Sequence, residues 1–187
     1  MVEFDDVSVV IPTVRESLVT PATVPDDAEV IVRRDEGLNV ARNAGVRAAS
    51  ADWIVIADDD IEFPTATVAE TLGRMDRQTL AGLRDFPPLR WVIGRLMIFH
   101  RDLWNRVGGF DERRHHGGDT DFAIRVEKEG GRVLQLERDV VPHYDEETGD
   151  TMVTRGHLEW TWYLLRRHPR VFGPVAAKLL ANKLRPR

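Results

Sequence analysis

Three short runs rich in β-branched residues constrain the fold of this 187-residue chain more than any other feature. They lie at residues 7–13, 29–32 and 53–57, and each has the length and composition of a buried strand. Residues 38–49, between the second run and the third, repeat apolar side chains at helical spacing. Strand, crossover, strand, helix and strand in this order predict a parallel sheet with helices on its faces.

The rest of the chain continues the same α/β pattern. The first crossover, residues 14–28, holds Pro21 and Pro25 and looks too short for a full helix. We expect a single α/β domain with a Rossmann-like, mostly parallel sheet flanked by helices, followed by a helical C-terminal tail. The further elements are predicted as helices over 64–77, 101–107 and 120–129, strands over 91–99 and 132–137, and tail helices over 155–168 and 174–184.

Composition excludes several classes of protein. Acidic residues number 31 against 26 basic ones, and the resulting net charge of −5 argues against nucleic-acid binding. There is no cysteine, so disulfides and thiolate metal sites are excluded. The first six residues show no signal-peptide pattern, and no apolar run approaches the roughly 18 residues of a membrane span. We therefore expect a cytoplasmic protein that at most lies on a membrane surface.

Basic residues are concentrated near the C-terminus. Residues 151–187 hold eight basic side chains and one acidic side chain, a charge of +7, which leaves −12 for residues 1–150. We therefore predict a main domain over 1–150 and a basic, amphipathic helical tail over 151–187. Three roles stay open for the tail: a cap on the sheet, a contact in a homodimer, or peripheral anchoring to an anionic membrane face.

The most informative polar feature is Asp58-Asp59-Asp60, which directly follows the third apolar run. Ligand sites in parallel sheets lie at the carboxyl ends of strands, where Thr13, Asp35 and Asp58 are expected. Adjacent carboxylates repel one another, so water or a cation must stabilise them. If the segment is extended, Asp58 and Asp60 share one side and Asp59 faces elsewhere. An acidic turn and an oxygen-ligand site for Mg²⁺ or Mn²⁺ are equally supported by these residues alone.

Two further places carry candidate chemistry. Asp119 and Asp121 open a predicted helix after Gly117-Gly118. Asp119 reads locally as a helix N-cap and Asp121 as a first-turn acid that suits the helix dipole. One of the two could instead serve as a general base on a rigid helix start. His143 follows a strand and a proline, and a lone histidine of this kind is more often structural than a metal or phosphate ligand.

Taken together, these segments resemble a family 2 glycosyltransferase with the A-type glycosyltransferase fold. The resemblance runs from about residue 7 to residue 144 and depends on the order and spacing of several blocks. These blocks are Val-Ser-Val-Val-Ile-Pro-Thr at 7–13, Ala-Arg-Asn-Ala-Gly at 41–45, Ile-Ala-Asp-Asp-Asp at 56–60, Val-Gly-Gly-Phe-Asp-Glu at 107–112, and Gly-Asp-Thr-Asp-Phe at 118–122 with Arg125. The resemblance decides the open question at residues 58–60 in favour of a metal site.

The resemblance implies how a nucleotide sugar would be held. Pro12, Thr13 and Asp35 would line the nucleotide pocket, with Asp35 reaching the base or the ribose. Arg42 belongs to the same donor-binding group, where it and Asn43 would brace the donor loop more than touch the sugar.

It also implies the catalytic residues. Asp58 and Asp60 match the D-x-D motif, with Asp58 towards the ribose and Asp60 on a divalent cation, Mn²⁺ or Mg²⁺, that bridges the diphosphate. His143 falls where members often place a histidine near the metal. Asp119 matches the catalytic base, which takes the proton from the acceptor.

The implied activity is inverting transfer of a sugar from a UDP- or GDP-sugar to an acceptor hydroxyl or phosphate. The acceptor would be a glycan or a polyprenyl-phosphate-type lipid. Two alternatives stay open. A degenerate transferase would bind nucleotide sugar or a protein partner without turnover. A sugar nucleotidyltransferase ranks lower, because it would usually carry a glycine-rich phosphate loop after the first strand, where Pro12 to Glu16 hold no glycine.

The chain departs from the family pattern in two places. Members commonly have Glu immediately before the catalytic aspartate, and Gly118 stands there instead. Residues 33–37, Arg-Arg-Asp-Glu-Gly, replace a more acidic, serine-containing turn, so the specificity for the base is open.

Overall fold

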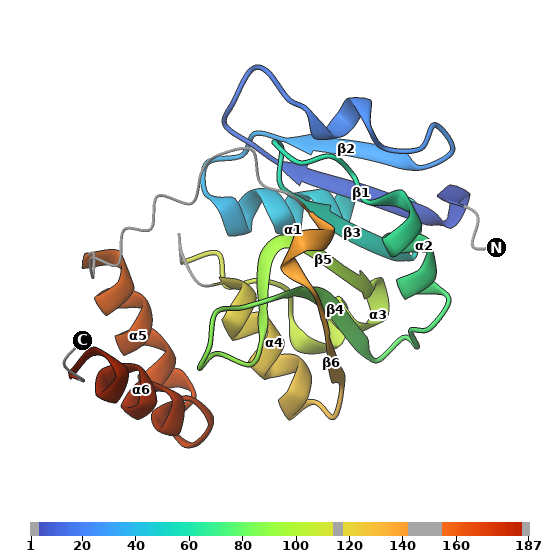
Figure 1. The fold of residues 1–187 in the computed structure, drawn as a ribbon. Coiled ribbons are helices and arrows are strands. Elements are labelled where there is room, and N and C mark those ends of the chain that lie inside the picture. The colour runs from blue at the N-terminus through green and yellow to red at the C-terminus, as the bar shows by residue number, and fades with distance from the viewer. Residues whose placement is uncertain (1–3, 114–117, 142–154, 185–187) are drawn as a thin grey trace.

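The computed structural model describes residues 4–113, 118–141 and 155–184, and within these ranges the chain forms one six-stranded sheet with helices on both faces (Figure 1). The strand order is β2-β1-β3-β5-β4-β6. The strands are β1 (Val7–Pro12), β2 (Glu29–Arg33), β3 (Trp53–Ala57), β4 (Thr79–Arg84), β5 (Val92–His100) and β6 (Arg132–Leu136).

Strand direction brings most carboxyl ends to one edge of the sheet. β1 pairs in parallel with β2 and with β3, and β6 pairs in parallel with β4. β5 alone runs antiparallel, between β3 and β4. The edge at which the other five strands end is therefore also the edge at which β5 begins. The expected mostly parallel α/β sheet is confirmed.

Alternating side chains of the strands build a core on each face of the sheet. On one face, Ile54 and Ile56 of β3 pack with residues of helices α1, α3, α4, α5 and α6. On the other face, Val55 and Ala57 pack with residues of α2. The helices are α1 (Leu38–Ala48), α2 (Thr65–Leu72), α3 (Arg101–Val107), α4 (Gly118–Lys128), α5 (Arg155–Arg167) and α6 (Pro169–Leu184), with short 3₁₀ turns η1 (Phe4–Asp6), η2 (Thr20–Ala22) and η3 (Arg138–Val140).

Three segments differ from the sequence-based prediction. The helix expected over 64–77 ends at Leu72, and strand β4, which was not predicted, follows it. The sequence of β4 is Thr-Leu-Ala-Gly-Leu-Arg, and its central alanine and glycine are residues that strands seldom contain. Gly82 is required there, because a Cβ at this position would lie 2.8 Å from the Leu96 carbonyl oxygen. In the tail, α6 begins at Pro169 and continues through Pro174.

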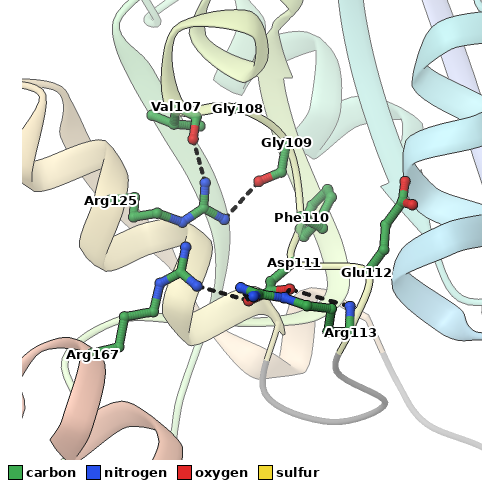
Figure 2. A pocket seen from close by; sticks show the side chains of 9 residues that line it. All are labelled: Val107, Gly108, Gly109, Phe110, Asp111, Glu112, Arg113, Arg125 and Arg167. Atoms are coloured by element: carbon green, nitrogen blue, oxygen red, sulfur yellow. Dashed lines mark hydrogen bonds and ion pairs between the residues drawn. The ribbon is translucent and has the colours of Figure 1, made fainter.

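Arg125 of α4 holds the loop between α3 and α4 (Figure 2). Its Nη1 donates to the carbonyl of Val107, and its Nη2 donates to the carbonyl of Gly109 at 2.6 Å. Its Nε donates to Asp121 Oδ2 at 2.8 Å, one helical turn away on the same helix. One guanidinium therefore fixes the loop, the helix and a buried carboxylate relative to one another.

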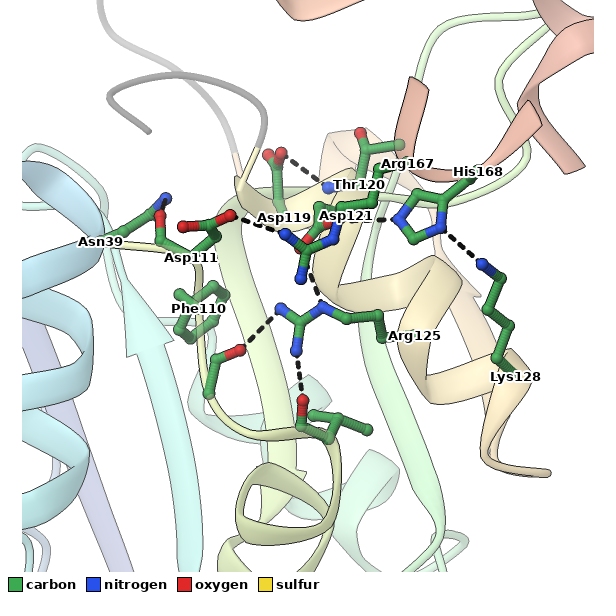
Figure 3. A network of polar contacts seen from close by, with 12 residues as sticks. Asn39, Phe110, Asp111, Asp119, Thr120, Asp121, Arg125, Lys128, Arg167 and His168 are labelled. Atoms are coloured by element: carbon green, nitrogen blue, oxygen red, sulfur yellow. Dashed lines mark hydrogen bonds and ion pairs between the residues drawn. The ribbon is translucent and has the colours of Figure 1, made fainter. Parts of the chain in front are cut away.

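The carboxylate of Asp121 joins α4 to the C-terminal helices (Figure 3). It is fully buried and accepts from His168 Nε2 at 2.8 Å, and Arg167 Nε lies 3.0 Å from the same oxygen. Lys128 Nζ lies 2.7 Å from His168 Nδ1. Because a lysine ammonium can only donate, Nδ1 is the acceptor and Nε2 carries the proton given to Asp121. Asp121 is therefore the centre of a charged network, and its predicted helix-dipole role describes only part of its environment.

Asp111 provides a second polar contact for α5. Tyr163 donates its hydroxyl to Asp111 Oδ2 at 3.0 Å, and Arg167 Nη1 donates to the same oxygen at 2.7 Å. Apolar packing adds to this, because Leu164, Phe172 and Val175 are buried in the core cluster on the α4 side of the sheet. Helices α5 and α6 thus pack on the α4 side of the sheet.

The outer surface of α5 keeps large apolar side chains exposed. Leu158 and Trp162, one turn apart, are each 62% exposed, and the Arg166 guanidinium lies 6.0 Å from the centre of the Trp162 ring. In the described parts of the chain, none of the helices has the length and apolar character needed to cross a bilayer. Peripheral membrane contact and dimerisation through the tail stay predictions.

We expect Asp121→Asn to lower the free energy of unfolding by about 3–5 kcal/mol at pH 7, because it removes the fully buried counter-charge of Arg125 and Arg167. Burial alone would raise the pKa of Asp121, but the His168 hydrogen bond and the charges of Arg125 and Arg167 lower it below its usual 3.8. The native carboxylate thus stabilises the fold above about pH 4, and that contribution is lost as the pH falls through the lowered pKa.

Urea unfolding followed by circular dichroism at pH 7 and near pH 3 measures this difference. Glu70→Gln is the matched control, because Glu70 forms an exposed pair with Arg74 at 3.1 Å and should cost under about 0.5 kcal/mol. Equal losses in the two variants at pH 7 would contradict the role given to Asp121.

Candidate functional site

Two neighbouring backbone residues of β5 position three of the predicted site residues. The Gly94 N–H donates to Asp119 Oδ2 at 2.7 Å, and the Asp58 N–H donates to the carbonyl of Arg95 at 2.9 Å. Arg42 Nη2 donates to the carbonyl of Gly94 at 3.2 Å. The structure therefore brings Asp58, Asp119 and Arg42 together at the edge of the sheet where β5 begins.

Asp119 is held from two directions. Its Oδ1 accepts from the Thr120 N–H at 2.8 Å while Oδ2 accepts from Gly94. Helix α4 begins at Gly118, so Asp119 lies inside the first turn and not at the expected N-cap position. A carboxylate offers about four lone-pair sites, so each oxygen can still accept a proton or a hydroxyl hydrogen bond.

Arg42 lies beneath the site and not on its surface. Its side chain is 3% exposed, and its guanidinium carbon lies 5.4 Å from the centre of the Phe110 ring. A Cβ on Gly94 would lie 2.1 Å from Arg42 Nη2, so any larger residue here would force the guanidinium to move. Asn43 is also buried and donates to the carbonyl of Phe110 at 2.8 Å. Both side chains brace the loops around the site.

The three consecutive aspartates follow β3 as a turn, not as the extended stretch that was expected. The prediction that Asp59 and Asp60 face opposite sides is therefore wrong. Arg15 Nη1 lies within reach of both carboxylates, at 2.9 Å from Asp60 Oδ2 and 3.7 Å from Asp59 Oδ1. The Thr13 hydroxyl donates to Asp59 Oδ2. The Thr20 hydroxyl donates to the Asp58 carbonyl at 2.7 Å, which anchors the turn to the first crossover.

Asp58 is the aspartate of this turn with a strongly shifted pKa. Burial raises the pKa of Asp58 to about 6, the charge of Arg42 opposes the rise, and Asp60 adds to it. A carboxylate in this setting is stabilised as an anion by a bound cation. In the described ranges, however, acidic and histidine side chains form no group of three that could hold a metal. His143 lies outside the described residues.

This donor set fits an ion that is shared with a substrate. Mg²⁺-type ions are usually bound through one or two carboxylates together with substrate phosphates and water. Asp58 and Asp60 can supply those carboxylates, whereas a cage made wholly of protein ligands would need more side chains.

The ends of β1 and β2 form the part of this sheet edge where the sequence predicts nucleotide binding. Pro12 is the last residue of β1, and the Thr13 N–H donates to the carbonyl of Arg33 at 2.8 Å. Asp35 accepts two hydrogen bonds from Arg33, both at 2.8 Å, and this pairing lowers the pKa of Asp35. Asp35 therefore lies near Thr13 as an anion with a fixed orientation.

The structure gives a physical reason for Gly118. Asn39 is buried and donates from Nδ2 to the carbonyl of Asp111 at 3.0 Å. A Cβ at position 118 would lie 2.3 Å from Asn39 Oδ1. Asn39 thus fills the space that a larger residue before Asp119 would need.

Gly118→Ala should destabilise the protein by about 1–3 kcal/mol through overpacking, and Asn39→Ala in the same chain should restore part of the loss. Thermal unfolding of the single and double variants measures this coupling. Gly173→Ala is the control, since nothing lies within 4 Å of a Cβ there and an alanine in α6 should be neutral or stabilising. Additive effects at residues 39 and 118 would contradict the contact.

Asp85 is a further buried carboxylate at this edge of the sheet, and the sequence did not reveal it because it follows the unpredicted strand β4. It is 8% exposed, and its Oδ1 accepts from the Phe86 N–H at 2.6 Å. Burial raises the pKa of Asp85 to about 6, the Phe86 N–H opposes the rise, and the negative charge of Asp119 adds to it. A second carboxylate therefore lies close enough to Asp119 for the two charges to interact.

Asp85→Asn should stabilise the fold at pH 7.5 by up to about 3 kcal/mol, at about 1.4 kcal/mol per pKa unit. The charged form of Asp85 is disfavoured in the native state, so its cost is full above pH 6 and absent below the unfolded value of 3.8. The gain measured by urea unfolding should therefore fade between pH 6 and pH 4. A gain that persists at pH 4, or an equal gain from the exposed Asp26→Asn, would contradict this assignment.

An open pocket of about 330 Å³ lies beside the loop between α3 and α4 (Figure 2), and neither Asp85 nor Asp119 lines it. Its charged lining comes from three arginines and two acids. Arg113 donates from Nη2 to Asp111 Oδ2 at 2.9 Å, so the charges in the pocket are largely paired. The lining residues are Val107, Gly108, Gly109, Phe110, Asp111, Glu112, Arg113, Arg125 and Arg167.

Comparison with known proteins defines the family. The model of the family described as Glycosyl transferase family 2 matches residues 13–126. The match covers more than half of the chain, and the chain therefore belongs to glycosyl transferase family 2. An uncharacterized protein of Mycobacterium tuberculosis is 27% identical over 105 residues, which cover 54% of this chain and 39% of that protein. The chain thus spans about two fifths of the length of this curated relative.

Solved structures confirm the A-type glycosyltransferase fold. The mannosyltransferase PcManGT of Pyrobaculum calidifontis, solved with GDP-Man and Mn²⁺, matches with a TM-score of 0.59 and 18% identity, over 87% of this chain and 60% of that one. The catalytic domain of Drosophila β1,4-galactosyltransferase 7, solved with xylobiose, matches with a TM-score of 0.54 and 17% identity, over 82% and 77% of the two chains. At these identities the likeness concerns the fold.

Proposed function

We propose that this chain is an inverting glycosyltransferase that moves a sugar from a UDP- or GDP-sugar to an acceptor. One observation carries the proposal: Asp119 and Asp58 bind the backbone of adjacent β5 residues, Gly94 and Arg95. A base and a nucleotide-binding carboxylate are thereby held at one edge of the sheet. The family membership and the nucleotide sugars bound by structural neighbours support the same reaction class.

In this proposal the donor binds across the ends of β1, β2 and β3. Pro12, Thr13 and Asp35 hold the nucleoside, and Asp58 lies towards the ribose. Arg42 keeps the supporting loops in place from below. The Arg33–Asp35 pair limits how Asp35 can turn, so it presents a fixed acceptor to a ribose hydroxyl or a base N–H.

A divalent cation, Mn²⁺ or Mg²⁺, would be held by Asp58 and Asp60 together with the donor diphosphate, with His143 a further candidate ligand. When bound, such an ion neutralises negative charge on the leaving diphosphate. Asp60 is paired with Arg15 in this structure, and the Arg15 side chain is half exposed and long enough to turn away.

Asp119 then acts on the acceptor. Its free lone pair takes the proton of the acceptor hydroxyl as the acceptor oxygen forms a bond to the anomeric carbon. The bond from that carbon to the diphosphate oxygen breaks, and the nucleoside diphosphate leaves with the electron pair. Attack opposite the leaving group inverts the anomeric centre, and no covalent enzyme intermediate forms. The backbone N–H groups of Gly94 and Thr120 keep Asp119 oriented for this step.

Asp119→Asn should keep UDP or GDP affinity within about twofold and lower turnover by about 10²–10⁴, the usual contribution of general-base catalysis. Asp60→Ala should lose the Mn²⁺-dependent part of nucleotide binding. Calorimetry with UDP and GDP, with and without Mn²⁺, and hydrolysis of their sugars measure both effects, with Glu70→Gln as control. Near-normal turnover of Asp119→Asn would remove the base assignment. Binding without hydrolysis or transfer in the native chain would favour the degenerate transferase.

A further inference from the structure

The end of β4 places an unusual pair of residues beside the proposed base. Asp85 follows the last residue of β4, and its N–H donates to the carbonyl of Trp91 at 3.2 Å, which closes the β4–β5 connection. In the described parts of the chain its carboxylate accepts one hydrogen bond, from its own neighbour Phe86. Asp85 is only 8% exposed, and among these residues it forms no ion pair within 4 Å, although the charge of Arg138 acts on it from farther away.

Phe86 presents an aromatic ring next to this carboxylate. It is 47% exposed, whereas Leu83 of β4 and Leu96 of β5 are fully buried. The Arg138 guanidinium, from the turn after β6, lies 3.8 Å from the centre of its ring. Arg138 thus holds the ring in place by a cation–π contact from one side.

The combination fits a sugar. A pyranose offers apolar C–H groups that pack on an aromatic ring and hydroxyl groups that donate to carboxylates, and binding sites commonly combine these two kinds of contact. The charge is equally informative. Asp85 and Asp119 are two carboxylates at this end of the sheet whose charges interact, so a phosphate group placed between them would be repelled by both.

We propose that Asp85 and Phe86 form the acceptor subsite, and that they select a neutral sugar hydroxyl over a phosphate. The inference rests on the proposed transferase function and narrows its acceptor class. Phe86 packs against the sugar ring, and Asp85 accepts from a hydroxyl adjacent to the one that Asp119 deprotonates. Asp85 is a positioning and specificity residue in this scheme, and Asp119 alone takes the proton.

Saturation-transfer NMR measures acceptor binding to the full chain in the presence of UDP or GDP and Mn²⁺. The probes are the methyl glycosides of glucose, galactose, mannose and N-acetylglucosamine, with geranyl phosphate as the phosphate probe. We expect at least one glycoside to bind, Phe86→Ala and Asp85→Asn to weaken it tenfold or more, and Phe86→Trp to restore binding. The controls are Trp162→Ala, which removes a more exposed aromatic ring on α5, and the exposed Asp26→Asn; neither should change binding.

Three outcomes overturn the inference: no glycoside binds, binding is unchanged in Phe86→Ala and Asp85→Asn, or geranyl phosphate binds more tightly than every glycoside. Circular dichroism and nucleotide calorimetry on the same samples test for a purely structural role of Asp85. Variants at residues 85 and 86 should leave both the spectrum and the nucleotide affinity unchanged. Failure of UDP and GDP to bind the native chain contradicts the proposed function itself. If nucleotides bind but substitutions at residues 85 and 86 do not change glycoside binding, only the proposed acceptor subsite is contradicted.

Discussion

The backbone of β5 at Gly94 and Arg95 is the constraint on which the site depends. Its N–H and carbonyl groups hold Asp119, Arg42 and Asp58 at once, although the three come from different parts of the chain. The pairing of β5 with β4 shifts register beside Gly94, between Gly82 and Leu83, and backbone groups freed from a ladder by such an irregularity are available to side chains. The Arg95 carbonyl instead extends the pairing of β5 with β3 by one bond, to the Asp58 N–H. The one antiparallel strand of a mostly parallel sheet thus organises its functional edge.

A second constraint lies on the opposite side of Asp119. Helix α4, whose first turn contains Asp119, also carries Asp121, which pairs with Arg125, Arg167 and His168. The start of α4 is therefore attached to β5 at one point and to the C-terminal helices at another. The tail contributes to the orientation of the proposed base without touching it.

Much of the architecture could be predicted from local patterns. The β-branched runs identify β1, β2 and β3, and the aspartates after β3 and at the start of α4 follow from their order along the chain. β4 was not predicted because Ala81 and Gly82 have little preference for strands. Asp85 was therefore not recognised as the residue that follows a strand. The role of Asp121 could not be read locally, since its partners Arg167 and His168 come from the tail. The contact of Asn39 with residue 118 likewise exists only after folding.

The burial of the Asp121 network has a consequence for the medium in which the protein can work. Dissolved ions screen exposed charges over about 8 Å at physiological ionic strength, but they act far less on pairs that water does not reach. Surface pairs such as Glu70–Arg74 therefore weaken as electrolyte is added, whereas the fully enclosed Asp121 keeps its hold on α5 and α6. The attachment of the C-terminal helices through Asp121 should accordingly weaken less than these surface pairs when salt is added.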